Sequence, residues 1–340
     1  MNRIFSKTFI IAALIGMSNL QAQDISKRGT SSADFLKIGA GAKAKSMGSA
    51  FVAVADDISS IYWNPAGLSR LTGTHLMVDY TDLFADIKYN SVAFSYSTEE
   101  IGTFGFSYIS SDIPDQEVTT EEYPDGNGQV FSSKQSVISI AYSLQLTDRF
   151  SIGFNPKVVY ESYWKTTAYG FALDIGALYD TPFEGVTLGM SITNFGAKMR
   201  LQGTTTTILH DPYPSGSGNN PRIPGNLSTG EFDLPLNYKL GVSYKAYKDD
   251  LNYLILSSEV AHPSDNYESM NVGAEYIYGD FISLQAGYKS IFLEGSEEGL
   301  TLGGGIKYMV SNNLWSNFNY SYAEFGVLGY IQNITIGLNF

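Results

Sequence analysis

The chain has 340 residues, a formal net charge of -13, 14% aromatic residues, 34 glycines and no cysteine. The lack of cysteine excludes a disulfide scaffold, a thiolate metal site and a cysteine nucleophile, and the acidic balance argues against nucleic acid as a partner. A composition rich in aromatic residues and glycine, with only 16% charged residues, favours β-sheet over helix.

Residues 1–22 are predicted to be a secretory signal peptide. Arg3 and Lys7 precede an apolar stretch from Phe9 to Met17, and Leu20-Gln21-Ala22 forms a small-residue cleavage site. The apolar stretch is too short to span a bilayer, and no apolar run of 18 residues follows it, so helical membrane spans are not expected. We therefore expect an exported mature chain that begins at Gln23.

Residues 23–73 differ from the remainder of the chain. Small residues dominate this segment, and it lacks the alternation of a strand. Its large apolar residues argue for packing rather than for a disordered tail; they are Phe35, Met47, Phe51, Trp63 and Leu68. The simplest location is the interior of a barrel, where the segment would act as a plug or hatch.

The hatch segment contains a compact motif, Asp56-Asp57 followed by Asn64-Pro65-Ala66-Gly67-Leu68. Asn64 is pushed out of the helical region by the proline after it, Pro65 has a fixed φ, and Gly67 permits a positive φ, so a sharp turn is expected. Asp56 and Asp57 could cap a short helix that begins near Ile58. The motif is then either a structural turn that seats the plug or part of a movable gate that contacts ligand.

From residue 74 onward the sequence alternates between apolar and polar residues with period two. Each alternating segment has about 10 residues, the length that a tilted strand needs to cross a bilayer. The segments are 74–82, 87–98, 101–110, 134–146, 149–161, 169–180, 185–194, 235–247, 252–262, 269–278, 281–290, 299–308, 313–323 and 331–340. The predicted fold is therefore all-β: a single 14-stranded antiparallel transmembrane β-barrel of the outer membrane over residues 74–340. A soluble β-sandwich or solenoid is the alternative.

The connections support the barrel. Short turns such as Glu99-Glu100 follow the even-numbered segments, and mostly longer loops follow the odd-numbered ones, including 111–133 and 195–234. Outer-membrane barrels have short periplasmic turns and longer extracellular loops. This predicts a Gram-negative outer-membrane location with both termini in the periplasm, and outer-membrane lipid as a partner.

Ten charged residues are predicted to face the lumen, where charges of both signs normally pair with one another or with a plug. They are Asp79, Lys157, Glu161, Asp174, Lys239, Lys245, Glu259, Glu275, Lys289 and Lys307. Lys43 and Lys45 of the hatch segment are expected to anchor it to the acidic wall residues.

Asn155-Pro156 stands in the middle of a predicted strand, where a proline removes a ladder hydrogen bond and a closed barrel offers no free edge. A bulge or a local break is expected. The functional interpretation is a lateral opening toward the membrane, and the simpler one is a bulge.

The sequence ends on Phe340, the last residue of an alternating strand. We expect this aromatic terminus to serve as a signal for the barrel-assembly machinery. The histidines His75, His210 and His262 lie on different segments and form no recognisable catalytic motif, so neither an enzyme nor a metal or other cofactor is expected.

The motif also carries a resemblance to a known family. The string from Ala53 to Leu68 resembles the hatch signature of the FadL family of outer-membrane transporters, and the fuller string from Phe35-Leu-Lys-Ile-Gly to Gly48-Ser-Ala-Phe51 is similar to its PorV/PorQ branch. The resemblance implies a hatch-filled barrel of fourteen strands. For the PorV/PorQ branch it also implies type IX secretion, with secreted protein cargo or secretion-system components as partners. For FadL proper it implies passive passage of small hydrophobic molecules such as fatty acids, and both functions stay open here.

Overall fold

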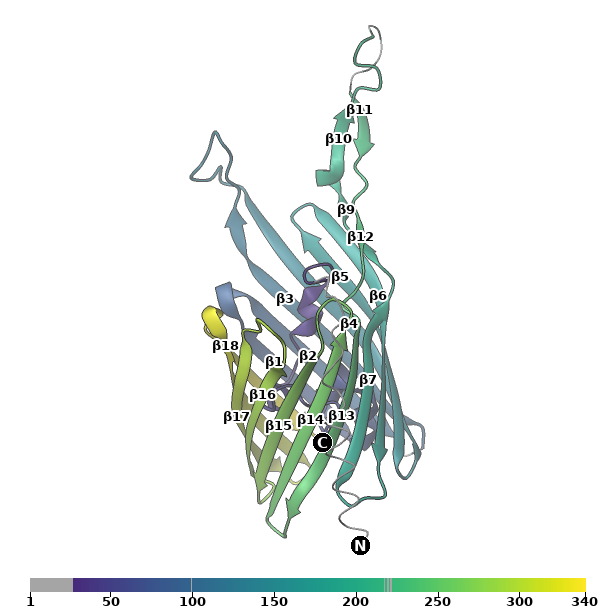
Figure 1. Cartoon of the computed structure of the whole chain (residues 1–340), viewed down its shortest axis with the longest axis vertical. Coiled ribbons are helices and arrows are strands. Elements are labelled where there is room, and N and C mark those ends of the chain that lie inside the picture. The colour runs from purple at the N-terminus through teal and green to yellow at the C-terminus, as the bar shows by residue number, and fades with distance from the viewer. Residues whose placement is uncertain (1–26, 99, 217, 219, 221) are drawn as a thin grey trace.

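The computed structural model describes residues 27–98, 100–216, 218, 220 and 222–340. Fourteen antiparallel strands form one closed barrel (Figure 1), which confirms the predicted fold class. The predicted signal peptide, residues 1–22, and the expected mature start at Gln23 lie outside the described residues.

The wall strands follow the chain order around the barrel, and each pairs with its neighbours. They are β1 (Thr74–Asp82), β2 (Lys88–Thr98), β3 (Gly102–Glu117), β4 (Val130–Thr147), β5 (Phe150–Tyr163), β6 (Thr166–Asp180), β7 (Val186–Gly196), β13 (Asn237–Lys248), β14 (Asn252–Pro263), β15 (Ser269–Tyr278), β16 (Ile282–Ile291), β17 (Glu298–Ser311), β18 (Leu314–Phe325) and β19 (Tyr330–Asn339). The pairing of β1 with β19 closes the ring.

Alternation in the sequence appears directly as alternation in exposure. In β4, Ile138 and Ile140 are exposed on the outer surface, whereas Val137, Ser139 and Ala141 are buried inside. An apolar outer face and a small or polar inner face are what a lipid-embedded barrel with a filled lumen requires. In the described part of the chain, the helices are all too short or too polar to cross a membrane.

Strands β3 to β6 are longer than most of the other strands and form a tall wall that rises above the remainder of the barrel (Figure 1). The loop predicted at 111–133 is therefore wrong in extent: β3 continues to Glu117, β4 begins at Val130, and only 118–129 connect them. The upper parts of these strands carry polar residues on both faces. They lack the alternation that made the membrane-spanning parts recognisable.

The connection between β7 and β13 is structured. It contains β8 (Met199–Arg200), β9 (Gln202–Gly203), η4 (Thr204–Thr206), β10 (Thr207–His210), β11 (Ile223–Asn226) and β12 (Glu231–Phe232). Its base packs over the barrel through buried Met199 and Leu234, and the hairpin of β10 and β11 projects away from the barrel (Figure 1). The base is thus ordered by this chain itself, and only the hairpin stands free.

Residues 27–73, which we call the inner segment, run through the barrel. They contain η1 (Asp34–Lys37), α2 (Ala42–Ser46), α3 (Ser60–Trp63) and η2 (Pro65–Arg70); the remaining short turns are η3 (Phe84–Asp86) and η5 (Gly326–Leu328). The segment begins at the long-loop end, where Ser31 bridges to Asp233, and reaches the opposite, short-turn end at Gly73. There Thr74 and Phe340 exchange backbone hydrogen bonds of 3.1 and 2.9 Å.

Candidate functional site

Three pairs of glycines on neighbouring strands bring the wall directly against the inner segment. The pairs are Gly153 with Gly176, Gly189 with Gly241, and Gly273 with Gly287. A Cβ on Gly153 would lie 2.3 Å from the carbonyl carbon of Pro65, and one on Gly273 would lie 2.3 Å from the carbonyl oxygen of Met47. Only glycine allows the two backbones to approach so closely.

Each glycine pair holds a different stretch of the inner segment. The first pair contacts residues 64–66, the second contacts 52–53, and the third contacts 47–48. The wall is thus shaped to the inner segment on three sides. These glycines could not be recognised from the sequence, because only the strand register shows that they pair and face inward.

The Asn-Pro-Ala-Gly-Leu turn is fully buried at the first pair. Asn64 donates from Nδ2 to the carbonyl oxygens of Val52 (2.7 Å) and Ala177 (3.1 Å), and its Oδ1 accepts the N–H of Ala66. Gly67 does not adopt the expected positive φ. It is needed because a Cβ there would lie 2.4 Å from the Ala55 carbonyl oxygen.

Glu259 on β14 binds the second stretch. Its Oε2 accepts the backbone N–H groups of Phe51 (3.2 Å) and Val52 (3.0 Å), and Lys239 Nζ lies 3.5 Å from Oε1. Lys239 also stands 4.6 Å from the ring centroid of Trp63, a cation–π geometry. A buried carboxylate with several donors is a strong local attachment.

Lys43 of α2 connects the inner segment to the wall. Its Nζ lies 2.8 Å from Glu275 and 3.0 Å from Asp56. Burial alone would lower the pKa of Lys43, but Asp56 and Glu275 outweigh it and raise that pKa well above its usual value. Lys43 therefore stays charged, as predicted for an anchor on an acidic wall residue.

The two aspartates of the motif have different roles. Asp57 accepts the N–H of Ser59 at 2.8 Å, close to the expected cap, whereas Asp56 turns to Lys43. Burial, followed by the neighbouring Asp56 charge, raises the pKa of Asp57 to about 6. Helix α3 begins only at Ser60, and neither aspartate is its N-cap residue.

Lys45 faces a hydroxyl rather than a carboxylate. Its Nζ donates to Thr81 Oγ1 at 2.6 Å, and burial lowers its pKa to about 8. Asp79 lies close by and accepts from Asn333 (3.1 Å) and from Thr335 (2.5 Å). The expected Lys45 ion pair with a wall carboxylate is therefore replaced by a hydrogen bond.

Lys157 and Asp174 form a buried ion pair of 2.8 Å between β5 and β6. Asn155 donates to Asp174 and to the Ile61 carbonyl oxygen, both at 3.1 Å. The neighbouring Pro156 pairs with Leu173 in an uninterrupted β5–β6 ladder. On the other side, the β4–β5 ladder is interrupted opposite Ile140 and Ala141 without a change of register, so there is a local break but no bulge.

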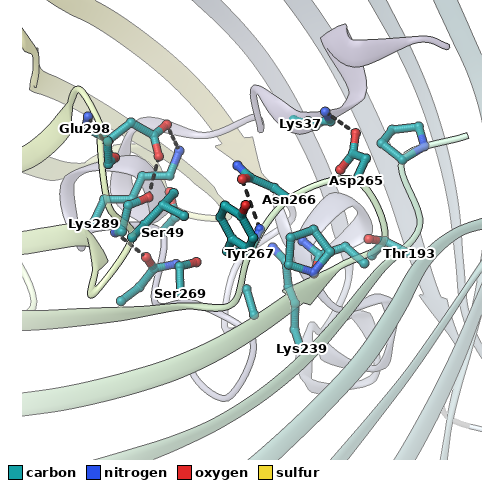
Figure 2. Close-up of a pocket in the computed structure, with 18 of the residues that line it drawn as sticks. Lys37, Ser49, Thr193, Lys239, Asp265, Asn266, Tyr267, Ser269, Lys289 and Glu298 are labelled. Carbon is teal, nitrogen blue, oxygen red and sulfur yellow. Dashed lines mark hydrogen bonds and ion pairs between the residues drawn. The ribbon is translucent and has the colours of Figure 1, made fainter. Parts of the chain in front are cut away.

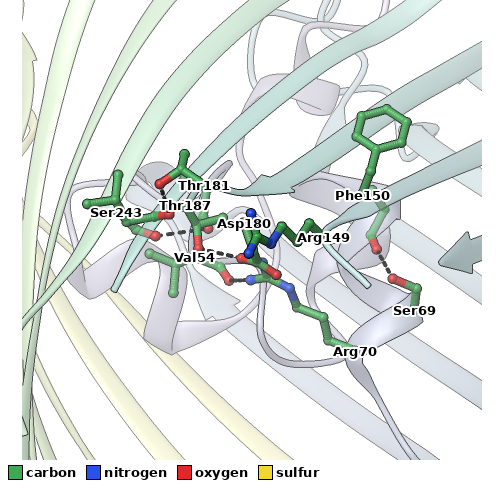
Figure 3. A network of polar contacts seen from close by, with 12 residues as sticks. Val54, Ser69, Arg70, Arg149, Phe150, Asp180, Thr181, Thr187 and Ser243 are labelled. Atoms are coloured by element: carbon green, nitrogen blue, oxygen red, sulfur yellow. Dashed lines mark hydrogen bonds and ion pairs between the residues drawn. The ribbon is translucent and has the colours of Figure 1, made fainter. Parts of the chain in front are cut away.

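Arg70 holds the end of the inner segment at the short-turn rim (Figure 3). Its guanidinium lies 2.7 Å from Asp180 and donates to the Val54 carbonyl oxygen at 3.2 Å, while Thr187 donates to Asp180 at 2.7 Å. The residue was not among the sequence-predicted site residues.

The other predicted lumenal charges are scattered. Glu161 accepts from Tyr163 and Gln135, and Lys289 pairs with Glu298 at the long-loop end. Lys245 and Lys307 are exposed near the short-turn rim, where Lys307 stands 5.1 Å from the centroid of Trp315. Of these four residues only Lys289 forms an ion pair, and they do not converge on one centre.

Above the inner segment, the lumen opens at the long-loop end into a pocket of about 430 Å³ (Figure 2). We call it the outer pocket; its wall combines charged, amide and aromatic side chains, and includes Lys37, Trp63, Asn237, Lys239, Asp265 and Tyr267. Lys37 contacts both Asp34 and Asp265, so the charges of this pocket are largely compensated.

Two smaller pockets adjoin the inner segment. An apolar pocket of about 220 Å³ lies beside the outer pocket, between Ile38, the β1–β2 connection at Leu83 and Phe84, and the wall residues Phe325 and Ile331. A polar pocket of about 240 Å³ opens at the short-turn end around Lys43, Asp57 and Glu275. Helix α2 separates these two smaller pockets. In the described residues, no three histidine or acidic side chains are placed to hold a metal ion.

The fold is shared with solved outer-membrane barrels. Similar structures include the toluene transporter TodX of Pseudomonas putida (TM-score 0.55, 14% identity, covering 89% of this chain and 99% of that chain). They also include the toluene transporter TbuX of Ralstonia pickettii (TM-score 0.54, 13% identity, covering 88% of this chain and 97% of that chain). A FadL homologue of Pseudomonas aeruginosa is similar to the same degree (TM-score 0.54, 13% identity, covering 89% of this chain and 98% of that chain). At these identities the likeness concerns the fold alone.

In sequence, residues 21–262 match the family described as type IX secretion system protein PorV. The chain belongs to the PorV family. No curated protein matches it in sequence. Membership of the PorV family together with the barrel fold places the chain in the outer membrane of a Gram-negative bacterium, and both confirm the resemblance noted in the motif.

Proposed function

We propose that this PorV-family protein acts without catalysis in type IX secretion, binding and escorting exported proteins at the outer face of the membrane. The observation that carries the proposal is the seating of the inner segment on three glycine pairs. A molecule that crossed the lumen would have to displace backbone that lies against backbone. A barrel filled in this way is better suited to presenting surfaces than to conducting solutes.

The surfaces available to a partner are at the long-loop end. The tall wall and the β10–β11 hairpin stand there (Figure 1), and the outer pocket opens there. The hairpin exposes Ile208, Leu209 and Ile223, and among the strands that the structure describes it forms a separate two-stranded sheet. Two-stranded ribbons are marginally stable alone and offer open edges for pairing, so the hairpin is the proposed contact for an exported protein.

The test is to trim the hairpin. Leu227 donates to the Thr206 carbonyl oxygen at 2.8 Å, so residues 207–226 can be replaced by a short glycine turn. The matched control replaces 119–128, where the Val118 N–H and the Gln129 carbonyl oxygen are bonded at 2.9 Å. We expect the hairpin variant in nanodiscs to bind a purified type IX-exported protein at least tenfold more weakly, and the control to bind normally. Undiminished binding by the hairpin variant would contradict the role of the hairpin.

A second candidate is the passage of small hydrophobic molecules, which the apolar pocket at Phe84 and Phe325 favours. It predicts uptake of a hydrophobic fluorescent solute into vesicles that contain the wild-type barrel. Uptake without any binding of exported protein would favour this candidate over the escort role.

A further inference from the structure

Two neighbouring loops at the long-loop end expose large apolar side chains. Residues 292–297 join β16 to β17, and residues 326–329 join β18 to β19; together we call them the low rim. Phe292 is 83% exposed and Val327 is 87% exposed, the highest fractions among the large apolar residues that the structure describes. Contiguous exposed apolar surface normally marks an interaction site.

The exposure is fixed by ordered backbone. Gly329 donates to the Gly326 carbonyl oxygen at 3.1 Å, Phe325 donates to that of Gly329 at 2.8 Å, and Val327 donates to the Glu297 carboxylate at 3.0 Å. The last bond ties the two loops together. Phe292 has a φ of 68°, a conformation that is unfavourable for a bulky residue and needs the surrounding structure to hold it.

The apolar residues beside them point the other way. Leu293 lines the outer pocket, and Phe325 lines the outer and apolar pockets and contacts Phe84 with ring centroids 5.4 Å apart. Phe292 and Val327 line none of these pockets. In Figure 1 the turn η5 protrudes sideways from the barrel rim. The two side chains are thus directed outside the lumen.

Below the low rim, the outer surface of the barrel is mainly apolar, with the exposed Glu324 and the partly exposed Gln332 among its residues. Tyr288, Leu300, Leu302, Tyr322 and Tyr330 are exposed there, and the rings of Tyr322 and Tyr330 stack at 5.4 Å. This is the lipid-facing band with the aromatic residues that accompany its edge. The low rim also exposes the carboxylates of Glu294 and Glu297, and the upper ends of the tall-wall strands expose Asp112, Asp115 and Glu117.

We propose that the low rim is immersed in the outer leaflet of the outer membrane, with Phe292, Val327 and Leu328 among the acyl chains. The occupant of this surface is lipid because the patch continues the lipid-facing band of β16 to β19. The tall wall and the hairpin then stand in water on the opposite side of the long-loop end of the barrel. This inference goes beyond the proposed function and does not depend on it.

The chain has no cysteine, so single cysteines can carry a spin label. We would introduce Phe292→Cys and Val327→Cys, with Leu302→Cys as the lipid-facing control and Leu209→Cys on the hairpin as the aqueous control. The protein is placed in vesicles of phosphatidylethanolamine and phosphatidylglycerol. Accessibility to oxygen, which concentrates among acyl chains, is compared with accessibility to a water-soluble nickel chelate.

The expected oxygen-to-nickel ratio at 292 and 327 is several-fold above that at 209 and close to that at 302. A ratio equal to that at 209 overturns the proposal, because the low rim would then be in water. Low accessibility to both reagents also overturns it, because protein would then cover the patch. Should the Phe292→Cys variant fail to fold, Leu328→Cys in the adjacent turn provides the same comparison.

Discussion

At the scale of single residues, contact between the wall and the inner segment depends on glycines, which have no side chain to keep the two backbones apart. Gly153 and Gly176 face each other across β5 and β6, and the space above them is filled by residues 64–66. A side chain at either position would occupy the volume of the turn. Because packed interiors have few voids, even one methyl group has to displace something.

Gly153→Ala should therefore loosen the inner segment while leaving the ladder hydrogen bonds intact. The added Cβ would lie 2.3 Å from the Pro65 carbonyl carbon, and such overpacking costs about 1–3 kcal/mol. We expect a folded barrel that passes small sugars faster than wild type in a liposome-swelling assay. The control is Gly304→Ala on the outer surface, whose nearest neighbour atom would be 3.5 Å away. Equal permeability of wild type and Gly153→Ala would show that the close approach does not hold the segment.

At the scale of elements, alternation in the sequence predicted all fourteen wall strands, because lipid on one side and a filled lumen on the other impose period two. The upper parts of β3 and β4 were missed, since they stand above the membrane and need no apolar face. The β10–β11 hairpin was missed for the same reason. Contacts such as the hydrogen bond from Asn64 to the Ala177 carbonyl oxygen could not be predicted, because they depend on how distant segments meet.

The candidate site was predicted unevenly. The position of the Asp-Asp and Asn-Pro-Ala-Gly-Leu motif within a plug-like segment followed from its small residues and its resemblance to known hatches. The hydrogen bonds from backbone N–H groups to Glu259 could not be predicted. Glu259 and Lys245 were both predicted to face the lumen, and nothing in the sequence shows that Glu259 is buried against the inner segment whereas Lys245 is exposed at the rim. Strand register decides which charges meet, and the sequence pattern fixes register only between neighbours.

The lateral opening at Asn155 and Pro156 stays a prediction, and the interrupted β4–β5 ladder gives it a test. Pro156→Val restores an N–H opposite Ile140, and a net hydrogen bond contributes about 0.5–1.5 kcal/mol. We expect higher thermal stability and slower transfer of a hydrophobic solute through the wall. Phe154→Val is the control, because it changes an exposed side chain in the same strand at a position already paired with Tyr142. If Pro156→Val leaves transfer unchanged, the proline only removes a hydrogen-bond donor from the ladder and makes no lateral opening.

At the scale of the whole molecule, the described chain begins and ends at opposite ends of the barrel. Both termini were predicted to lie in the periplasm; Phe340 lies at the short-turn end, but the first described residues lie at the long-loop end, and residues 1–26 are outside the described part of the chain. Arg28 donates to Asn266 and to the Glu294 carbonyl oxygen at the long-loop end, whereas Phe340 is bonded to Thr74 at the other. The inner segment thus crosses the full depth of the barrel before the first wall strand starts.

Labelling of single cysteines on intact cells tests this orientation. Lys27→Cys and Leu209→Cys should react with an impermeant maleimide from outside, because both positions are exposed at the long-loop end. Glu100→Cys, in a short turn, should react only after the outer membrane is permeabilised. Labelling of Glu100→Cys alone on intact cells would mean that the barrel is inserted the other way round.

The course of the inner segment also constrains how the protein is made. The segment leads directly into β1, and β1 is the strand that pairs with β19, so the N-terminal part of the described chain is enclosed by a ring that its last strand closes. Once that ladder has formed, residues seated against glycines on three sides have no route by which to enter. We therefore expect the segment to be in place before β1 and β19 pair, a pairing that the backbone hydrogen bonds between Thr74 and Phe340 extend to the end of the chain.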